Sequence, residues 1–600
     1  MRVLIHCPEA DIQPFYAPMA LIAHSLKARG HKVFMSSCSG SFGRCIPKLA
    51  TPLSLSPSDN AAICGRCRSQ TPPFVSALDL NLIPLESFME PDLDASITAL
   101  IEAWPGNKWD FEFDGQKLGR CAQFDLFLGH KAYEGAPITE AGQTFFLEVL
   151  HTVVKTYAVT KRLIAGLSIE RVVVYNQYGP NMAVALAAKA CGAEARFMAN
   201  SSHAGVDRSV VWFTQWGPCQ FYKDISADWV SWSKVALKPD MVGLVAEDIK
   251  FRFLSGSVHV YSPGKAFDVP DIRDSIGLRK DRRTIVVYTS SPDELHAQYA
   301  ADEALGLSLA RPVLAFPDQI AWFEDLKRTA ANRQDLQICV RVHPREGPNR
   351  RDNIRSQHLA LLEQVFGDLP DNMKVVWPED KVSSYDLLEC ADLVMTGWST
   401  MGLESARFGI PVLSVFQSVV GCPVGDFIKV PGSAEEYYAL LDAMLGAPAN
   451  LGNIRQAFRW YYVSKFTAAV SVGDAFPRGE NQIIGKLLDN IETIERIIEI
   501  REPEERRRLS NWLAEGSGES DWLTEQALVK TELVRIILYF MTGQWREDDV
   551  DLRFGPGGGP LDGNQATLEA ADGWCELQLG ADRYRKMSRM VERLGRLLAS

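Results

Sequence analysis

The stretch YDLLECADLVMTGWSTMGLESARFGIPVLSVF, residues 385–416, has the pattern of a short helix (385–390), a strand, a turn, a second helix and a second strand. Residues 392–396 are an apolar run of strand length, which is typical of a strand buried on both faces. Residues 401–408 are predicted to be helical, because Gly409 follows them and Pro411 comes next, as at many helix ends. Residues 412–416 form the next predicted strand. Ser399 and Thr400 therefore lie between the end of a strand and the start of a helix.

This position is where an open α/β sheet binds its ligand. The start of a helix offers unpaired N–H groups and positive dipole character to a phosphate, and the two hydroxyls add donors. Glu404 lies one helical turn further on, where a carboxylate can accept a hydrogen bond from a ribose hydroxyl. The alternative is a buried unit in which Ser399 only caps its helix, the usual role of serine at a helix start.

A second stretch, QICVRVHPRE at residues 337–346, favours the ligand-binding interpretation. It is another buried-type strand, and it ends at His343-Pro344 because proline stops a strand. A His-Pro strand end followed in the chain by a Ser-Thr turn is more specific than either motif alone.

These motifs resemble those of the GT-B glycosyltransferases of bacterial surface polysaccharide assembly, especially the capsule-type enzymes that transfer Kdo or sialic acid from a CMP-sugar. The resemblance covers most of residues 1–470 and includes the stretches 316–326, 341–346, 384–394 and 399–413. It implies that His343, Pro344, Ser399 and Thr400 hold the donor phosphate and that Glu404 holds the ribose. The sequence departs from the family pattern in having Gly397-Trp398 before the Ser-Thr pair.

The composition is that of an ordinary globular chain: 600 residues, 46% hydrophobic and 23% charged, with a formal net charge of −12. The acidic balance argues against a nucleic-acid-binding protein. The N-terminal sequence lacks a basic signal-peptide region, no apolar run is long enough to span a bilayer, and the 12 cysteines are expected to be reduced thiols. We therefore expect a cytoplasmic protein, with peripheral binding at the inner face of the membrane as a further prediction.

The N-terminal part is predicted to begin with strands at 2–7 and 32–37 around a helix at 19–29, without the glycine fingerprint of a dinucleotide-binding protein. Glu9 and Asp11 lie in the loop after the first strand, which in a GT-B enzyme faces the interdomain cleft and can reach the acceptor. They are candidate catalytic residues, and the alternative is that both are simply solvated.

Four cysteines follow, at Cys38, Cys45, Cys64 and Cys67. The last two form a C-x2-C half-site, and the first pair could complete a tetrahedral structural zinc site. Independent thiols are the alternative.

Further strands are predicted at 171–175 and 195–199, and polar turns follow each of them. His203 and Asp207 are additional catalytic candidates, while Asn176 and Arg208 are candidates for contacting the acceptor. All four are predicted at the ligand edge of the first sheet.

In the second sheet, a strand at 284–289 is followed by Ser290 and Ser291, which are candidate phosphate contacts. A strand at 375–377 is followed by Pro378, Glu379 and Asp380, which are predicted to frame the base and ribose.

These patterns predict an α/β, GT-B-like fold with two Rossmann-like parallel-sheet domains facing a cleft. The predicted domains are an N-terminal acceptor domain (1–262), a nucleotide-sugar donor domain (263–475) and a helical extension (476–600). The extension ends in a basic amphipathic helix at 582–600, which either packs on its own domain or contacts an anionic membrane or an assembly partner.

The predicted function is transfer of a sugar from a nucleotide-activated donor, with CMP-sugar favoured, to a glycan or lipid-linked acceptor. Catalysis is expected to need no metal or other cofactor, because N–H groups, hydroxyls and an imidazole can stabilise the departing phosphate. The alternatives are a CDP-alcohol phosphotransferase, a UDP-sugar 2-epimerase-like enzyme and a non-catalytic assembly subunit.

Overall fold

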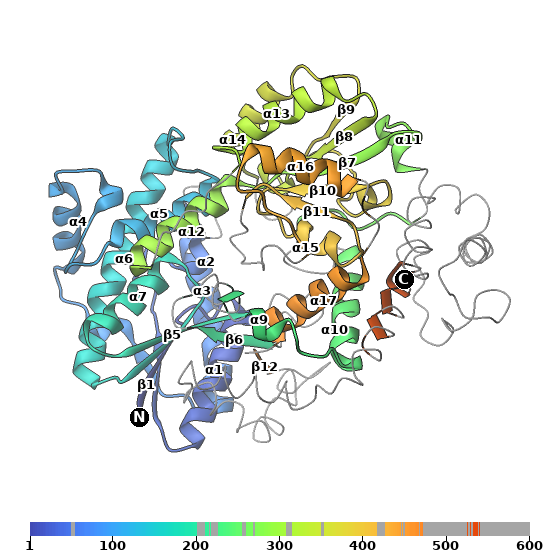
Figure 1. Cartoon of the computed structure of the whole chain (residues 1–600). Coiled ribbons are helices and arrows are strands. Elements are labelled where there is room, and N and C mark those ends of the chain that lie inside the picture. Colours follow the sequence, from blue (N-terminus) through green and yellow to red (C-terminus); the bar gives the residue numbers. More distant parts are fainter. Residues whose placement is uncertain are drawn as a thin grey trace.

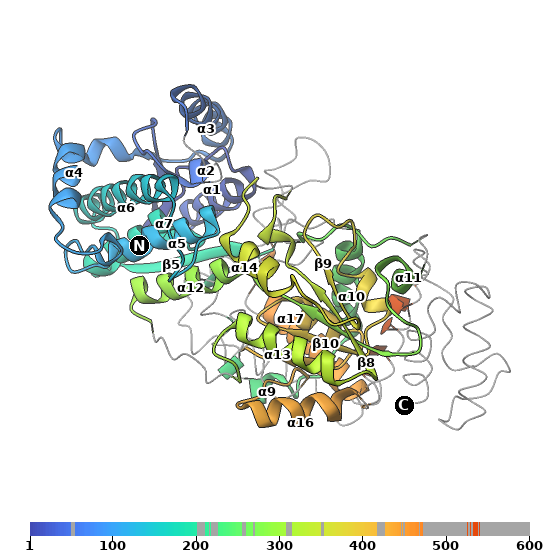
Figure 2. The same ribbon diagram turned by 90° about the horizontal axis from the view of Figure 1, so that it is seen from above.

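The computed structural model describes residues 1–49, 55–200, 210–214, 217, 222, 226–227, 229–254, 260–267, 271–307, 315–349, 353–416, 427–445, 447, 450–466, 469–471, 525, 528–529, 532–533, 535–537 and 539. Figures 1 and 2 show two α/β domains, with α1 (Gln13–Ala28), α3 (Pro57–Leu78), α6 (Glu140–Leu167) and α7 (Gly179–Ala190) gathered on one side. Helices α13 (Gln319–Asn332) and α16 (Ala434–Leu445) lie on the other.

The first domain is built on a seven-stranded sheet with the order β12-β6-β5-β4-β1-β2-β3. Strands β1 to β5 are parallel, β6 pairs antiparallel with β5, and β12 pairs antiparallel with β6 at the edge. The strands are β1 (Arg2–His6), β2 (Lys32–Ser37), β3 (Leu82–Pro84), β4 (Arg171–Tyr175), β5 (Glu194–Asn200), β6 (Val210–Thr214) and β12 (Ala469–Ser471). The central strands are buried on both faces, as the continuous apolar runs of β1 and β4 predict.

Helices cover this sheet: α1 (Gln13–Ala28), α2 (Ile46–Leu49), α3 (Pro57–Leu78), α4 (Leu93–Ala103), α5 (Leu118–His130), α6 (Glu140–Leu167) and α7 (Gly179–Ala190), with short 3-10 turns η1 (Leu85–Phe88) and η2 (Lys108–Asp110). Helix α6 begins where Thr139 accepts a hydrogen bond from the backbone N–H of Gly142, and its apolar face is buried against α5 and α7.

The second domain is built on a five-stranded, fully parallel sheet with the order β11-β10-β7-β8-β9. Its strands are β7 (Arg283–Tyr288), β8 (Leu336–Arg341), β9 (Met373–Val376), β10 (Leu393–Thr396) and β11 (Val412–Ser414). Its helices and turns are α11 (Ile272–Ile276), α13 (Gln319–Asn332), η3 (Pro344–Glu346), α14 (Gln357–Val365), η4 (Asp386–Glu389), α15 (Met401–Ala406) and α16 (Ala434–Leu445). The predicted fold class of two parallel-sheet α/β domains is thus confirmed.

The domains exchange elements. Helix α12 (Pro292–Leu305) directly follows β7 of the second sheet, yet it packs against α5 and α7 of the first domain (Figure 1). In the other direction, α17 (Leu451–Phe466) leads into β12, which pairs with β6 at the edge of the first sheet. Helix α10 (Pro239–Phe253) precedes residue 262 but packs against α17, while the short α9 (Trp229–Trp232) also contacts α17.

The described residues between 525 and 539 are helical and lie in the apolar core beside α10 and α17 (Figure 1). Val529, Leu533, Ile536 and Ile537 are fully buried there. The predicted basic helix at 582–600 lies outside the described residues. Within the part of the chain that the structure describes, no helix has the length and apolar character needed to cross a membrane.

Candidate functional site

A cavity opens at the carboxyl edge of the second sheet. Strand β7 pairs with both β8 and β10, so the segments that follow these three strands meet at one place. The cavity is lined by Arg252, Val260, Tyr261, Ser262, Tyr288, Thr289, Arg341, His343, Pro344, Ser384, Tyr385, Ser399, Thr400, Met401 and Glu404. The predicted donor residues His343, Pro344, Ser399, Thr400 and Glu404 are therefore brought together around one cavity.

His343 is held by its backbone and by its ring. Its N–H donates to Thr289 Oγ1 at 2.8 Å, and its Nδ1 accepts from the N–H of Arg345 at 3.1 Å, which caps the turn η3. Desolvation lowers the pKa of His343 to about 4, so the imidazole is neutral near pH 7. Because Nδ1 is an acceptor, the single ring proton of the neutral form lies on Nε2, which makes Nε2–H a hydrogen-bond donor.

The Ser-Thr turn sits between β10 and α15. Ser399 Oγ accepts from the N–H of Met401, the first residue of α15, at 3.3 Å, and the serine also lines the cavity. Thr400 is exposed. Gly397 leaves little room for a side chain, since a Cβ there would lie 3.0 Å from Ser290 Oγ and 3.3 Å from Gln319 Oε1. Trp398 is buried and packs edge-on against Phe416, which accounts for the departure from the family pattern as a packing feature.

Glu404 is buried and fixed in place. One of its oxygens accepts from Tyr385 Oη at 2.7 Å and the other from Arg252 Nη1 at 3.2 Å. Arg252 and Arg407 both donate to Asp248, at 2.7 and 2.9 Å. Through Arg252, the Glu404 carboxylate therefore belongs to a buried ionic network that joins α10 to α15. A carboxylate oxygen can accept more than one hydrogen bond, so Glu404 can still receive a hydroxyl from the cavity.

Arg341 lines the same cavity and was not singled out in the sequence. Its side chain is 1% exposed. Nη1 donates to the carbonyls of Val376 and Trp377, but Nε and Nη2 have no hydrogen-bond partner among the described residues. Desolvation lowers the pKa of Arg341 to about 10. The signal that could have found it is a charged residue within an otherwise apolar strand, QICVRV.

Three predicted donor contacts do not line this cavity. Ser290 is buried, and its Oγ accepts from the N–H of Trp398 at 2.9 Å. The hydroxyl of Ser291 donates to Asp293, at the start of α12. Glu379 is exposed in the loop after β9. The two serines support the fold of the neighbouring loops in this structure.

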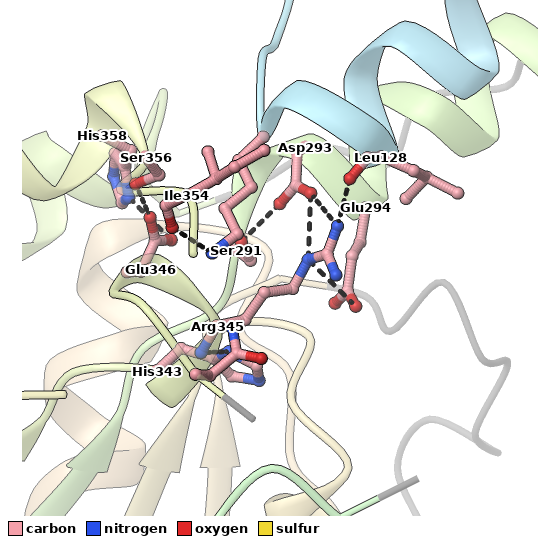
Figure 3. A network of polar contacts seen from close by, with 12 residues as sticks. Leu128, Ser291, Asp293, Glu294, His343, Arg345, Glu346, Ile354, Ser356 and His358 are labelled. Carbon is pink, nitrogen blue, oxygen red and sulfur yellow. Dashed lines mark hydrogen bonds and ion pairs between the residues drawn. The ribbon is translucent and has the colours of Figure 1, made fainter. Parts of the chain in front are cut away.

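The loop that carries His343 is tied to the first domain (Figure 3). Arg345 donates to Asp293 at 2.7 and 3.0 Å and to the carbonyl of Leu128, in α5, at 2.7 Å. Lys131, just after α5, donates to the carbonyls of Gly347 and Ile354. The His-Pro loop is thus positioned by both domains.

Figure 3 also shows Glu346 pointing toward Ser356 and His358. Desolvation opposes ionisation of this fully buried carboxyl, but hydrogen bonds from the two side chains outweigh it and lower the pKa of Glu346. These contacts join η3 to the start of α14.

A second cavity lies at the carboxyl edge of the first sheet. Its lining includes His6, Glu9, Lys48, Pro180 and the four cysteines Cys38, Cys45, Cys64 and Cys67. Desolvation raises the pKa of the buried Glu9 to about 8 and lowers that of His6 to about 3. Glu9 is therefore largely protonated at pH 7 and can gain or lose a proton at a pH close to 8.

The four cysteines surround this cavity, with Cys64 and Cys67 one turn apart on α3. Within the described ranges, no group of three or more His, Cys, Asp or Glu side chains has the arrangement that would hold a metal ion. Burial raises the pKa of the thiols of Cys38, Cys45 and Cys67, so protonated thiols are favoured in this structure. Structural zinc at these residues stays a prediction.

The remaining acceptor-side candidates are dispersed. Asp11 forms a two-pronged ion pair with Arg66 of α3, at 2.9 Å. Asn176 follows β4 with a φ of 52°, and its N–H donates to Met198 O at 2.7 Å. Neither is among the residues that line the two cavities. His203, Asp207 and Arg208 lie outside the described residues.

No family model matches this sequence, and no curated protein matches it. Among solved structures, the chain is similar to a UDP-GlcNAc 2-epimerase from Methanocaldococcus jannaschii in complex with UDP-GlcNAc and UDP, at 11% identity over 76% of this chain and 98% of that one, with a TM-score of 0.27. It is also similar to S. aureus MnaA with UDP, at 12% identity over 83% of this chain and 98% of that one, with a TM-score of 0.25. A third similar structure is the glycosyltransferase VinC in complex with dTDP, at 15% identity over 83% of this chain and 100% of that one, with a TM-score of 0.23. At these TM-scores the fold assignment rests on the two sheets and their strand order.

Proposed function

We propose that this chain is a GT-B-type glycosyltransferase that moves a sugar from a nucleotide-activated donor to a glycan or lipid-linked acceptor. The observation that carries the proposal is the cavity at the second sheet. Five residues that the sequence motifs assign to donor binding, His343, Pro344, Ser399, Thr400 and Glu404, converge there from two separate segments, at the edge where parallel sheets bind ligands.

The chemistry of the cavity suits a departing phosphate. When the bond between the anomeric carbon and the phosphate oxygen breaks, the bonding electrons stay with the phosphate and its charge grows. The Nε2–H of His343 and the hydroxyls of Ser399 and Thr400 line this cavity as hydrogen-bond donors, with His343 and Ser399 partly buried and Thr400 exposed. Such donors stabilise the developing charge without having to reorient during the reaction.

Glu404 suits the sugar part of the nucleotide. Its carboxylate is held by Tyr385 and Arg252 and lines the cavity close to the start of α15. We infer that it accepts a hydrogen bond from a ribose hydroxyl, in agreement with the role that the sequence resemblance implies.

The charge of the cavity supports a CMP-sugar as the donor. Its described lining contains the cations Arg252 and Arg341 and the anion Glu404, with His343 neutral, so the lining carries one net positive charge. A CMP-sugar carries one negative charge on its single phosphate, whereas a UDP-sugar carries two. A second phosphate would have to be desolvated without a matching cation, which is unfavourable.

The cavity at the first sheet is the candidate acceptor side. Glu9, whose pKa is raised to about 8, is the candidate general base: its ionised form, the minor form at neutral pH, would remove the proton from the acceptor hydroxyl as that oxygen attacks the anomeric carbon. His203 and Asp207 remain alternative candidates from the sequence. Cytoplasmic location and docking of the basic 582–600 helix on a membrane or assembly partner are further parts of the proposal.

A nucleotide panel in a thermal melting assay tests the proposal. A ligand that binds only the folded protein stabilises it by about 2.7 kcal/mol at a hundredfold excess over Kd, which shifts the Tm measurably. CMP is expected to stabilise the protein more than UMP, UDP or CDP. A preference for UDP would replace the CMP-sugar with a UDP-sugar, which both a transferase and an epimerase can use. A preference for CDP would favour the CDP-alcohol phosphotransferase, and no response from the folded protein would contradict a nucleotide-dependent enzyme.

A further inference from the structure

We propose that Arg341 is the principal phosphate-binding cation of this cavity and that it supplies the affinity for the phosphate of the bound nucleotide. This inference rests on the proposed function, since it names the residue that recognises the nucleotide's charge. It goes beyond the motifs, which assign the phosphate to His343, Ser399 and Thr400.

The first argument is that Arg341 has two buried N–H groups for which the protein provides no acceptor. Nε and Nη2 have no partner among the described residues, although the side chain is only 1% exposed and lines the cavity. An unpaired buried N–H of a charged group is costly, so such groups are normally matched in the functional state. An anion in the cavity would provide the missing acceptors.

The second argument is a contrast with other buried arginines of this chain. Arg252, Arg273, Arg345, Arg407, Arg455 and Arg459 each have a carboxylate at ion-pair distance. Arg341 has none among the described residues, within which its guanidinium donates to two backbone carbonyls. Asp380 and Glu379 act on it only through longer-range attraction. The guanidinium therefore keeps an uncompensated charge where a phosphate is expected to bind, and its fork of N–H groups suits phosphate oxygens.

The third argument is that Arg341 is dispensable for the fold. Both carbonyls that accept from Nη1 keep another donor, because the N–H of Val342 donates to Val376 O and the N–H of Asp380 donates to Trp377 O. Replacing Arg341 with methionine, which has a similar length, removes an unpaired buried charge and leaves no acceptor without a donor. The ligand-free variant is therefore expected to melt at the same temperature as the natural protein or higher.

The experiment compares nucleotides with their nucleosides. Binding of CMP, cytidine, UDP, uridine and inorganic pyrophosphate is measured by calorimetry on the full chain and on Arg341→Met. For the preferred nucleotide, the variant is expected to lose about 10- to 100-fold in affinity, the scale of one to two charge-assisted hydrogen bonds. Nucleoside affinity is expected to be unchanged, so that the variant hardly distinguishes the nucleotide from its nucleoside.

Two further variants sharpen the result. Arg279→Met removes the same charge from an exposed site paired with Asp281 and is expected to bind like the natural protein. Arg341→Lys keeps the positive charge but lacks the forked N–H groups of a guanidinium. Its affinity for the nucleotide is expected to lie between those of the natural protein and Arg341→Met. If Arg341→Met melted several degrees lower or failed to fold, the dispensability argument would be wrong, and Arg341→Lys would then decide the binding role.

The outcomes separate this inference from the proposed function. If the natural protein binds a nucleotide and Arg341→Met keeps the full preference over the nucleoside, the role of Arg341 is wrong and the proposed function stands. If the natural protein binds pyrophosphate in an Arg341-dependent way but no nucleotide, the anion site stands and the proposed function is wrong. If it binds none of the phosphate compounds, both are wrong.

Discussion

At the scale of single residues, His343 has two separable tasks. Its Nδ1 caps the η3 turn by accepting from the N–H of Arg345, and its Nε2–H is available to the cavity. His343→Ala is expected to lower kcat/KM by about 10²- to 10³-fold, as for the loss of one preorganised donor. It is also expected to destabilise the protein by about 1 kcal/mol through the lost cap.

His343→Asn serves as the matched control for this prediction. Its amide oxygen can replace the capping Nδ1, so stability measured by chemical denaturation should recover. The transfer rate, measured with a nucleotide-sugar donor, should stay low. Full activity in either variant would mean that His343 acts only as a cap.

Glu9 gives a prediction about pH. In the folded protein the pKa of Glu9 is raised from 4.5 to about 8, whereas in the unfolded chain it is expected near 4.5. Between these values the folded state holds the proton and the unfolded state does not, so this group lowers the free energy of unfolding as pH rises from 4.5 to 8. Each unit of pKa difference corresponds to about 1.4 kcal/mol.

Glu9→Gln should therefore be close to the natural protein in stability at pH 4.5 and more stable at pH 8. The measurement is the denaturation midpoint of both proteins across this range. A constant difference between the two proteins at every pH would show that the carboxyl does not titrate in this way.

The site residues that could be predicted from the sequence are those at recognisable strand ends. Proline after His343 and the small residues around Ser399 mark strand ends in the sequence, and both residues do line the cavity. The same rule also selected Ser290 and Ser291, whose hydroxyls are engaged with Trp398 and Asp293 instead. Arg341 was missed because a lack of partners is a property of the packed structure.

At the scale of elements, the strands were predictable and some helices were not. Buried parallel strands such as β8 and β10 can be recognised in the sequence as short, mostly apolar runs. Helix α3 (Pro57–Leu78) was not predicted as a long helix, because it contains Pro72 and Pro73 and lacks a clear apolar stripe. Its start could have been found in the Ser56 and Asp59 pair, which forms a capping box.

The contact between η3 and α12 gives an element-scale prediction. Arg345 and Asp293 form a buried ion pair, and Asp293 is desolvated enough that its pKa is raised even beside the arginine. Arg345→Met leaves this carboxyl unpaired and is expected to destabilise the protein by roughly 3–5 kcal/mol at pH 8. The loss should be smaller at pH 5, because Asp293 can then take up a proton.

Asp293→Asn and the double variant complete a thermodynamic cycle. The double variant is expected to be more stable than Arg345→Met alone, since no buried charge is left without a partner. Additive effects of the two substitutions would contradict the coupling between them.

At the scale of the whole molecule, the two domains depend on elements that the sequence order does not assign to them. Helix α12 follows β7 of the second sheet but packs on α5, and β12 follows α17 but pairs with β6. Patterns in the sequence identify such elements but not the domain that each one packs on, because an apolar helix face fits either sheet. The predicted boundary at 262 therefore separates α10 from α17, the helix against which it packs.

The C-terminal part is connected to the cavity at the second sheet through a series of contacts. Tyr539 stacks on Phe253 of α10 with ring centroids 6.0 Å apart, and Phe253 packs edge-on against Tyr385. Tyr385 in turn donates to Glu404 at the cavity. Residues more than 100 positions away in sequence thus support the shape of the candidate site.

Glu525 provides the test of this dependence. One of its oxygens accepts from Arg455 at 3.0 Å and from Arg459, and the other accepts from the N–H of Leu237 at 3.0 Å. The side chains of Glu525, Arg455 and Arg459 are all buried. Glu525→Gln removes the negative charge that the buried guanidinium groups of Arg455 and Arg459 share. We expect a loss of roughly 3–5 kcal/mol in the free energy of unfolding, the scale for breaking a buried ion pair from one side.

Glu532→Gln is the matched control for Glu525→Gln. Glu532 pairs with Arg535 three residues away, and both side chains keep some exposure, at 17% and 24%. Such a pair contributes less than about 1 kcal/mol, so this variant should unfold like the natural protein in a denaturant titration. If both variants unfolded at the midpoint of the natural protein, the contacts of Glu525 would not contribute to the stability of the second domain. A loss confined to Glu525→Gln would mean that the second domain folds around this segment and needs it to hold α10, and with it Arg252, beside the cavity.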